Sequence, residues 1–146
     1  KETKKWPVEN FAKLANLLEN EKIVIIGGKN EYNEFDLITK QSEERCINLC
    51  GKLSLKESGA LLADAKYIVT NDSGPFHIAR GVKTKSYVIF GPTDPGMFSY
   101  GEREKLIYAA EPCSPCSLHG DLNCPKGHFN CMKKITPESV YKIIKE

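Results

Sequence analysis

The chain has 146 residues, of which 40% are hydrophobic and 27% are charged, and its net charge is +2. This length suits one domain with a sizeable core, and the small net charge gives no reason to expect a nucleic-acid partner. No apolar run is long enough to cross a bilayer, and no signal peptide is recognisable.

Apolar residues recur at helical and strand spacings in alternation along most of the chain. Ser54 and Glu57 form a capping box that opens a helix, and Thr136 with Pro137 opens the last one. In chain order we expect helix 7–18, strand 22–28, helix 31–42, strand 46–49, helix 54–65, strand 67–70, a helix from about 74, strand 86–90, strand 106–110 and helix 137–145.

Strands that alternate with helices predict an α/β fold, a Rossmann-like doubly wound parallel sheet with helices on both faces. Residues 1–146 are expected to form a single domain. An irregular Cys-rich excursion at 111–133 precedes the closing helix at 137–145. Because a helix on a parallel sheet normally follows a strand, we expect a first strand upstream of Lys1.

A polar turn follows the strand at 67–70, at the edge where parallel sheets bind ligands. Gly74 begins a helix whose backbone N–H groups favour a phosphate, and it has no Cβ to obstruct one. Ser73 adds a hydroxyl donor, Asp72 caps the helix or accepts from sugar hydroxyls, and His77 could donate to an anion. The alternative interpretation is a plain N-cap with a histidine on the helix face.

Three other segments offer groups that suit the same ligand. Thr93, in the turn after the strand at 86–90, supplies a hydroxyl and a backbone N–H, and Asp94 follows it. Lys4 precedes a helix start, where a cation is unfavourable unless an anion is present. Glu31 could accept from ribose hydroxyls, although its surroundings lack the dinucleotide fingerprint. The alternatives are an ordinary turn, a solvated basic tail and a first-turn helix carboxylate.

The sequence resembles glycosyltransferase family 9, the bacterial lipopolysaccharide heptosyltransferases. The match covers nearly the whole chain and is to the C-terminal, donor-binding half of these enzymes. It is carried by several motifs in the right order and spacing. These are KKWP at 4–7, GG at 27–28 with Glu31, GKLSL at 51–55, NDSGPFH at 71–77, FGPTDP at 90–95, the late cysteines and Cys131-Met132.

The resemblance implies half of a GT-B glycosyltransferase, in which two Rossmann-like domains face a cleft and the N-terminal acceptor domain is missing here. It implies inverting, metal-independent transfer of heptose from ADP-heptose to the lipopolysaccharide inner core, with no cofactor. The general base belongs to the missing half, so this fragment alone should be inactive. The implied donor-binding residues are Lys4 at the phosphates, Glu31 at the ribose, Leu53 beside the adenine, and Asp72, Ser73, Gly74 and His77 around the diphosphate and sugar, completed by Thr93 and Asp94.

The implied partners are ADP-heptose or a related nucleotide sugar and a lipopolysaccharide core acceptor, without nucleic acid. The implied location is the cytoplasm at the inner face of the inner membrane, with peripheral membrane contact through the full-length enzyme. Lys85 and the Arg80-Gly81 pair depart from the family pattern, which affects local packing more than the site. Which sugar and which acceptor position are used stays open, and so does use of another ADP- or UDP-sugar.

Four cysteines gather near the C-terminus with two histidines nearby. They are Cys113, Cys116, Cys124 and Cys131. Structural zinc favours such sets, and the spacing of the first pair is typical of zinc sites. Disulfides are rare in the cytoplasm, so free thiols and a structural zinc on these four residues both stay open.

Two other classes of function are considered. A non-catalytic binding module organised by the Cys cluster would hold stoichiometric zinc and bind no nucleotide. A hydrolase would use Ser73, His77 and Asp72, but Ser73 lacks the nucleophile-elbow motif and the three residues fall within one helical turn.

Overall fold

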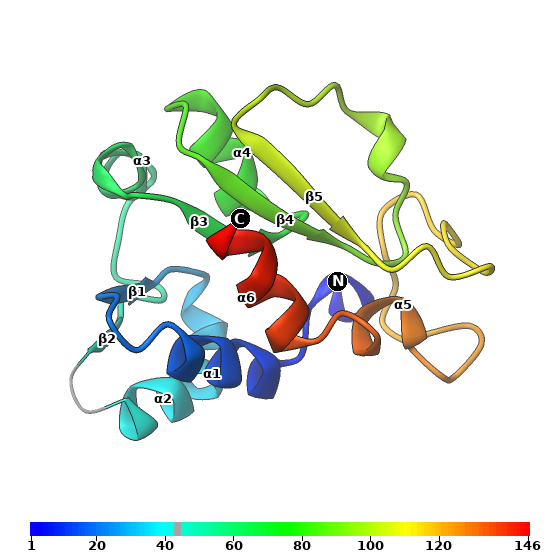
Figure 1. The fold of residues 1–146 in the computed structure, drawn as a ribbon, viewed down its shortest axis with the longest axis horizontal. Helices are drawn as coiled ribbons and strands as arrows, with labels where there is room; N and C mark the ends of the chain where they lie inside the picture. Colours follow the sequence, from blue (N-terminus) through cyan, green and yellow to red (C-terminus); the bar gives the residue numbers. More distant parts are fainter. Residues whose placement is uncertain (43–44) are drawn as a thin grey trace.

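The computed structural model describes residues 1–42 and 45–146, which form parallel strands flanked by helices (Figure 1). The 3-10 and α-helices are η1 (Glu2–Lys4), α1 (Val8–Leu17), η2 (Lys29–Glu31), α2 (Tyr32–Gln41), α3 (Leu55–Asp64), α4 (Gly74–Gly81), η3 (Pro95–Met97), α5 (Asn130–Lys133) and α6 (Pro137–Lys145). The strands are β1 (Ile23–Ile25), β2 (Cys46–Asn48), β3 (Ile68–Asn71), β4 (Ser86–Phe90) and β5 (Glu104–Tyr108).

The described strands pair in parallel, which confirms the predicted fold class. β1 pairs with β2, and Ile23 lies opposite Cys46. A second sheet has the order β3-β4-β5, in which Val88 of β4 lies between Thr70 and Leu106. In a doubly wound sheet the first strand of the domain lies between the second and the fourth. The upstream strand expected from the sequence would then separate β1 from β3, and it stays a prediction.

β4 is the centre of the larger sheet, and all five of its residues are buried. Tyr87 and Ile89 face a core shared with α1, α5 and α6. Val88 and Phe90 face the opposite side and pack with Phe76 of α4. A strand that is covered on both faces needs a continuous apolar run rather than an alternating one, and residues 86–90 have that pattern.

Most predicted elements are confirmed, and the cap at Ser54 shows why. Ser54 Oγ accepts from the backbone N of Glu57 at 3.2 Å, while the Glu57 carboxylate accepts from Ser54 N at 2.7 Å.

β5 begins two residues earlier than the predicted 106 because its first residue, Glu104, pairs with Ser86 in the sheet register. It ends before Ala110, whose φ of 51° breaks the extended backbone.

The residues that depart from the family pattern make local contacts. Arg80 Nε lies 2.9 Å from Glu104 Oε1, and its guanidinium also donates to the Ser99 carbonyl at 2.7 Å. Arg80 thus ties α4 to β5. The Lys85 ammonium lies over the Tyr87 ring at 5.2 Å. Both side chains therefore take part in local packing.

Trp6 anchors the segment before α1 and is only 1% exposed. Its indole Nε1 donates to the Ile135 carbonyl at 2.8 Å, and its ring meets the Phe11 ring edge-on, with 4.8 Å between the ring centroids.

Trp6→Phe should lower the free energy of unfolding by about 1–3 kcal/mol, because the buried Ile135 carbonyl loses its donor. Urea unfolding followed by circular dichroism measures this, since Trp6 is the only tryptophan. An unchanged midpoint would contradict the anchoring role.

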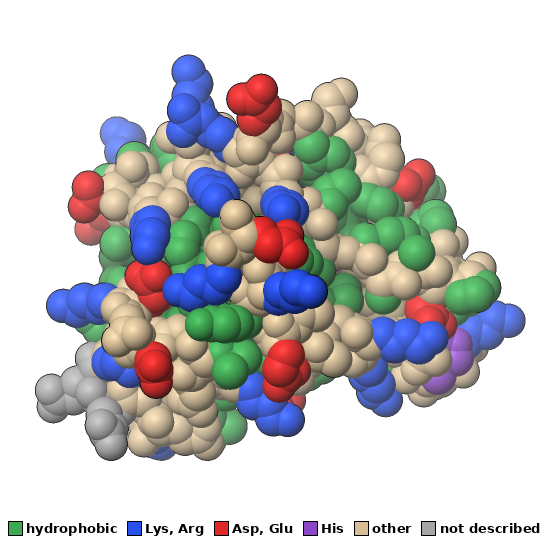
Figure 2. Space-filling model, viewed as in Figure 1, with side chains coloured by type: hydrophobic (Ala, Val, Ile, Leu, Met, Phe, Trp, Pro, Cys, Tyr) green, Lys and Arg blue, Asp and Glu red, His purple; other side chains and the backbone are tan. Residues whose placement is uncertain are grey.

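The surface drawn in Figure 2 carries Lys and Arg side chains interspersed with Asp and Glu, without a continuous basic surface. This face therefore gives no support to a nucleic-acid partner. Among the helices of the described residues, none combines the length and the apolar character needed to cross a bilayer.

Candidate functional site

Residues 1–6, called the N-terminal strap below, lie across the carboxyl-terminal ends of the strands. Lys4 Nζ is 2.6 Å from Asp72 Oδ2, just beyond β3. Lys5 Nζ is 3.8 Å from Glu31 Oε1, in the turn after β1. Figure 1 shows the N-terminus near the ends of β4 and β5. The strap therefore brings two cations to the edge where parallel sheets bind ligands.

Asp72 joins three segments at this edge, and the residue is 7% exposed. Besides the ion pair with Lys4, its Oδ2 accepts from the Thr93 hydroxyl at 3.2 Å. Thr93 is 2% exposed, so its side chain serves Asp72 rather than facing solvent. The two polar turns therefore meet, as the sequence predicted. Asp72 directs the Lys4 ammonium toward the start of α4.

The first turn of α4 presents backbone groups to open space. Ser73, in extended conformation, is the N-cap, and its hydroxyl donates to the Asn71 carbonyl at 3.3 Å. Gly74 is exposed, and a Cβ at this position would have no atom within 4 Å. A helix N-terminus carries N–H groups and positive potential that favour an anion. This end of α4 can therefore receive a phosphate at close range.

His77 is exposed one turn further along α4 and stands against aromatic rings. Its ring centroid lies 5.3 Å from that of Phe76 and 5.5 Å from that of Phe98. Behind them Tyr100 donates its hydroxyl to the Pro95 carbonyl at 2.7 Å. Burial, and then the charge of Asp72, raise the pKa of Tyr100 to about 12, so this hydroxyl stays protonated. His77 is the group here that remains accessible to a ligand.

Glu31 occupies the neighbouring part of the edge, beyond β1. Its Oε2 accepts from Gly28 N at 2.8 Å, while Oε1 faces Lys5. Burial opposes the charge of Lys5, but the hydrogen bond to Glu2 and the charges of Glu2 and Glu31 outweigh it and raise the pKa of the lysine. Leu53 is half-buried in the turn between β2 and α3. A carboxylate and an apolar side chain beside one strand pair suit a ribose and a base.

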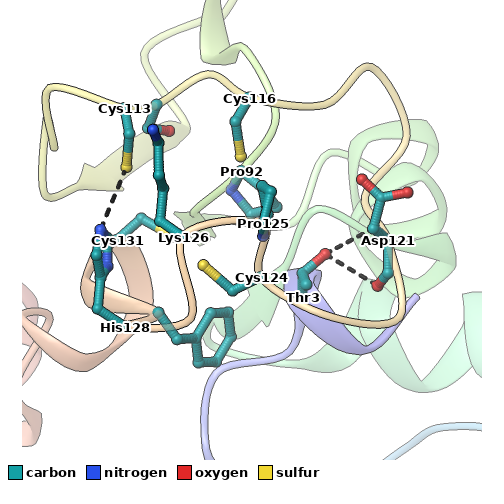
Figure 3. A pocket seen from close by; sticks show the side chains of 12 residues that line it. Thr3, Pro92, Cys113, Cys116, Asp121, Cys124, Pro125, Lys126, His128 and Cys131 are labelled. Carbon is teal, nitrogen blue, oxygen red and sulfur yellow. Dashed lines mark hydrogen bonds between the residues drawn. The ribbon is translucent and has the colours of Figure 1, made fainter.

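The remaining predicted residues make other contacts. Asp94 is exposed, and its Oδ1 accepts from Gly96 N at 2.7 Å as the cap of η3. The cysteines of the predicted zinc set line a separate pocket (Figure 3). The arrangement lacks a hydrolase relay within the described residues, because Ser73 donates to a backbone carbonyl and His77 packs on Phe98.

Two contributors were not chosen from the sequence. Asn71 Oδ1 accepts from Trp6 N at 3.0 Å and so fixes the strap on β3. Lys5 belongs to the KKWP motif, and the sequence predicts no separate role for it. The available signal for Asn71 was its position, a polar residue that ends a buried strand directly before Asp72.

A parallel α/β domain with a helix N-terminus and lysines at the strand ends defines a Rossmann-like domain. The model of glycosyltransferase family 9 (heptosyltransferase) matches residues 1–126. Lipooligosaccharide heptosyltransferase 2 of Campylobacter jejuni is 37% identical over 150 residues, covering 98% of this chain and 46% of that protein. The chain belongs to glycosyltransferase family 9.

Solved structures agree with this assignment. The E. coli ADP-heptose lps heptosyltransferase II matches with a TM-score of 0.78 and 26% identity, over 98% of this chain and 41% of that one. The E. coli heptosyltransferase WaaC with ADP-2-deoxy-2-fluoro heptose matches in fold, with a TM-score of 0.74 and 22% identity, over 99% of this chain and 39% of that one. The chain spans less than half the length of these relatives, and its fold is one Rossmann-like half of a GT-B fold.

Proposed function

We propose that this chain is the donor-binding half of a heptosyltransferase that transfers heptose from ADP-heptose to the lipopolysaccharide inner core. The observation that carries the proposal is the meeting of Lys4, Asp72, Thr93 and the start of α4 at one edge of the sheet. The E. coli relative of 26% identity is an ADP-heptose lps heptosyltransferase, which supports the choice of donor.

In this proposal the diphosphate lies between Lys4 and the first turn of α4. Gly74 leaves room for it, and Ser73 and Gly74 offer backbone N–H groups. Asp72 holds the Lys4 ammonium in place, and His77 donates to the diphosphate or sugar. On the β1–β2 side, Glu31 accepts from the ribose hydroxyls, and Leu53 lies beside the adenine. Thr93 and Asp94 shape the second turn.

The proposed reaction is an inverting displacement. The acceptor hydroxyl attacks the anomeric carbon of the heptose, and the bond from that carbon to the diphosphate oxygen breaks. The electron pair leaves with ADP, while the hydroxyl proton passes to a base outside this chain. Lys4 and the backbone N–H groups of Ser73 and Gly74 stabilise the charge that develops on the diphosphate. Because these groups are already in position, the proposed step needs no metal or cofactor.

The rest of the proposed enzyme would supply what this chain does not. The lipid-linked acceptor would be held by an N-terminal domain, and an upstream strand would pair between β1 and β3. Activity in the cytoplasm, with peripheral contact to the inner membrane, follows from such an acceptor and belongs to the same proposal.

A calorimetric titration of the whole protein with ADP, ADP-heptose, UDP and GDP tests the donor. We expect the ADP compounds to bind at least about tenfold more tightly than UDP or GDP, because this proposal places adenine beside Leu53. Equal binding of all four compounds would favour another nucleotide sugar. Binding of none would contradict the site, and with stoichiometric zinc it would favour the binding-module alternative.

A further inference from the structure

The Cys-rich excursion folds around a pocket that four cysteines line (Figure 3). Cys113, Cys116, Cys124 and Cys131 line this pocket together with His128. Cys131 comes from α5, and the other three come from the loops before it. In Figure 3 the sulfur atoms of Cys116 and Cys124 point into the same space. The pocket also touches Thr3 of the N-terminal strap and Pro92, but its lining includes none of Lys4, Asp72 and Gly74.

His128 and Glu111 support this cluster but are committed elsewhere. His128 Nδ1 accepts from Asn130 N at 3.0 Å, which places the ring proton on Nε2, 3.8 Å from Cys113 Sγ. Among the described residues, the possible ligand atoms that already lie within 4.8 Å of one another belong to Glu111, Cys113 and His128, but the Glu111 carboxylate pairs with Lys134. His128 is therefore placed to donate to a thiolate, and the thiols remain the free ligands.

The loop after Cys124 turns back toward that residue. Gly127 has a φ of +73°, and its N donates to the Cys124 carbonyl at 2.9 Å. Beyond this turn, His128, Phe129 and Cys131 line the same pocket as Cys124.

We propose that Cys113, Cys116, Cys124 and Cys131 form a tetrahedral thiolate site for zinc, separate from the donor edge and structural in role. Four sulfur ligands in tetrahedral geometry select zinc or iron among the common metals. Because the excursion has few regular elements of its own, a metal would fix the relative positions of its loops and α5.

The excursion is also tied to the N-terminal strap. Thr3 donates to the Asp121 carbonyl from both its backbone N and its hydroxyl at 3.0 Å, and Asp121 N donates back to the Thr3 hydroxyl at 2.7 Å. Gly120, with a φ of +76°, lies against Lys4, and a Cβ there would be 2.5 Å from Lys4 Cγ. The position of Lys4 therefore depends on the excursion.

A second link reaches the turn that carries Thr93. Cys116 N and Ser117 N donate to the Pro92 carbonyl at 2.9 and 3.1 Å, and the Ser114 hydroxyl donates to the Gly91 carbonyl. A metal bound to Cys116 would thus indirectly hold both the N-terminal strap and the turn that carries Thr93. This coupling to donor binding rests on the proposed function, whereas the metal site itself does not.

Elemental analysis of the whole protein, purified without chelators under reducing conditions, tests the site. We expect about one zinc per chain, and Co²⁺ added to the reduced apo-protein should give the thiolate charge-transfer bands of a tetrahedral site. Iron at the same stoichiometry also supports the site. Substoichiometric metal together with no cobalt bands would overturn it.

Two variants sharpen this test. Cys116 is exposed, so Cys116→Ser should leave the fold intact. If Cys116 is a metal ligand, this variant should no longer bind one metal ion per chain. Cys46→Ala is the control, because Cys46 lies in the core between α1 and α2, and this variant should keep one metal ion per chain. Full metal in Cys116→Ser would overturn the proposal, and so would a Cys131→Ser variant that keeps metal while His128→Gln loses it.

Metal removal should also weaken ADP binding roughly tenfold, as expected when one charge-assisted contact becomes disordered. Unchanged ADP affinity would overturn the link between the two sites but not the metal site. If the metal-loaded protein binds no ADP, the proposed function fails, while metal content still decides the proposal on the cysteines.

Discussion

Lys4→Ala should weaken ADP binding by about 10- to 100-fold and reduce turnover of the whole enzyme at least as much. The lysine is 2.6 Å from Asp72 Oδ2, so removing it takes away one cation and leaves that carboxylate without its partner. Asp72 is 7% exposed, and water screens its charge poorly. The loss of the Lys4 cation and the unpaired negative charge of Asp72 both weaken the binding of a diphosphate.

Calorimetry with ADP and a steady-state assay with ADP-heptose measure this effect. Because part of the loss comes from the uncovered carboxylate, the double variant Lys4→Ala/Asp72→Asn should regain some ADP affinity relative to Lys4→Ala. Lys66→Ala is the matched control, since Lys66 also pairs with a carboxylate, that of Glu21, away from the donor edge. Equal ADP affinity of Lys4→Ala and the natural protein would contradict the placement of the diphosphate.

The parts of the fold predicted correctly from sequence are those determined by local residue patterns. The largely apolar run at 86–90 forms β4, because a strand that is covered on both faces is typically hydrophobic along its whole length. Ser54 and Thr136 each cap a helix through residues within three positions of themselves. The two polar turns meet because parallel strands end at the same edge, a rule of topology that needs no coordinates.

Long-range contacts account for what the sequence left open. The pairs Lys4–Asp72, Trp6–Asn71 and Thr3–Asp121 join residues far apart in the chain, and nothing in the local pattern matches one partner to the other. The one-turn helix α5 was not predicted because it lies inside the irregular excursion, where apolar spacing gives no period.

Side-chain roles at the second turn show a different limit. The sequence predicts that Thr93 offers a hydroxyl and a backbone N–H to the ligand, and that Asp94 beside it also contacts the donor. In the structure these groups bind Asp72 and Gly96 N. Residue type alone does not reveal whether a polar group faces a ligand or another part of the protein. Their direct contact with the donor stays a prediction.

Gly74→Ala should change stability and donor binding in opposite directions. Position 74 opens α4, its φ is not positive, and an added Cβ would meet no atom within 4 Å. Alanine there should therefore raise the free energy of unfolding by about 0.5 kcal/mol, because the unfolded chain loses backbone freedom, and the melting temperature by roughly 1–2 °C. If the diphosphate lies against this turn, the same methyl group occupies its place, and ADP affinity should fall about tenfold or more.

Gly81→Ala provides a matched control at the other end of the same helix. An added Cβ at 81 also meets no atom within 4 Å, so the gain in stability should be similar while ADP affinity stays unchanged. Thermal unfolding and ADP calorimetry on both variants separate a packing effect from a ligand effect. A Gly74→Ala protein that is more stable and binds ADP normally would remove the diphosphate from the start of α4. A loss of affinity confined to position 74 would locate the phosphates there, because nothing else in the described fold occupies the space that the methyl group takes.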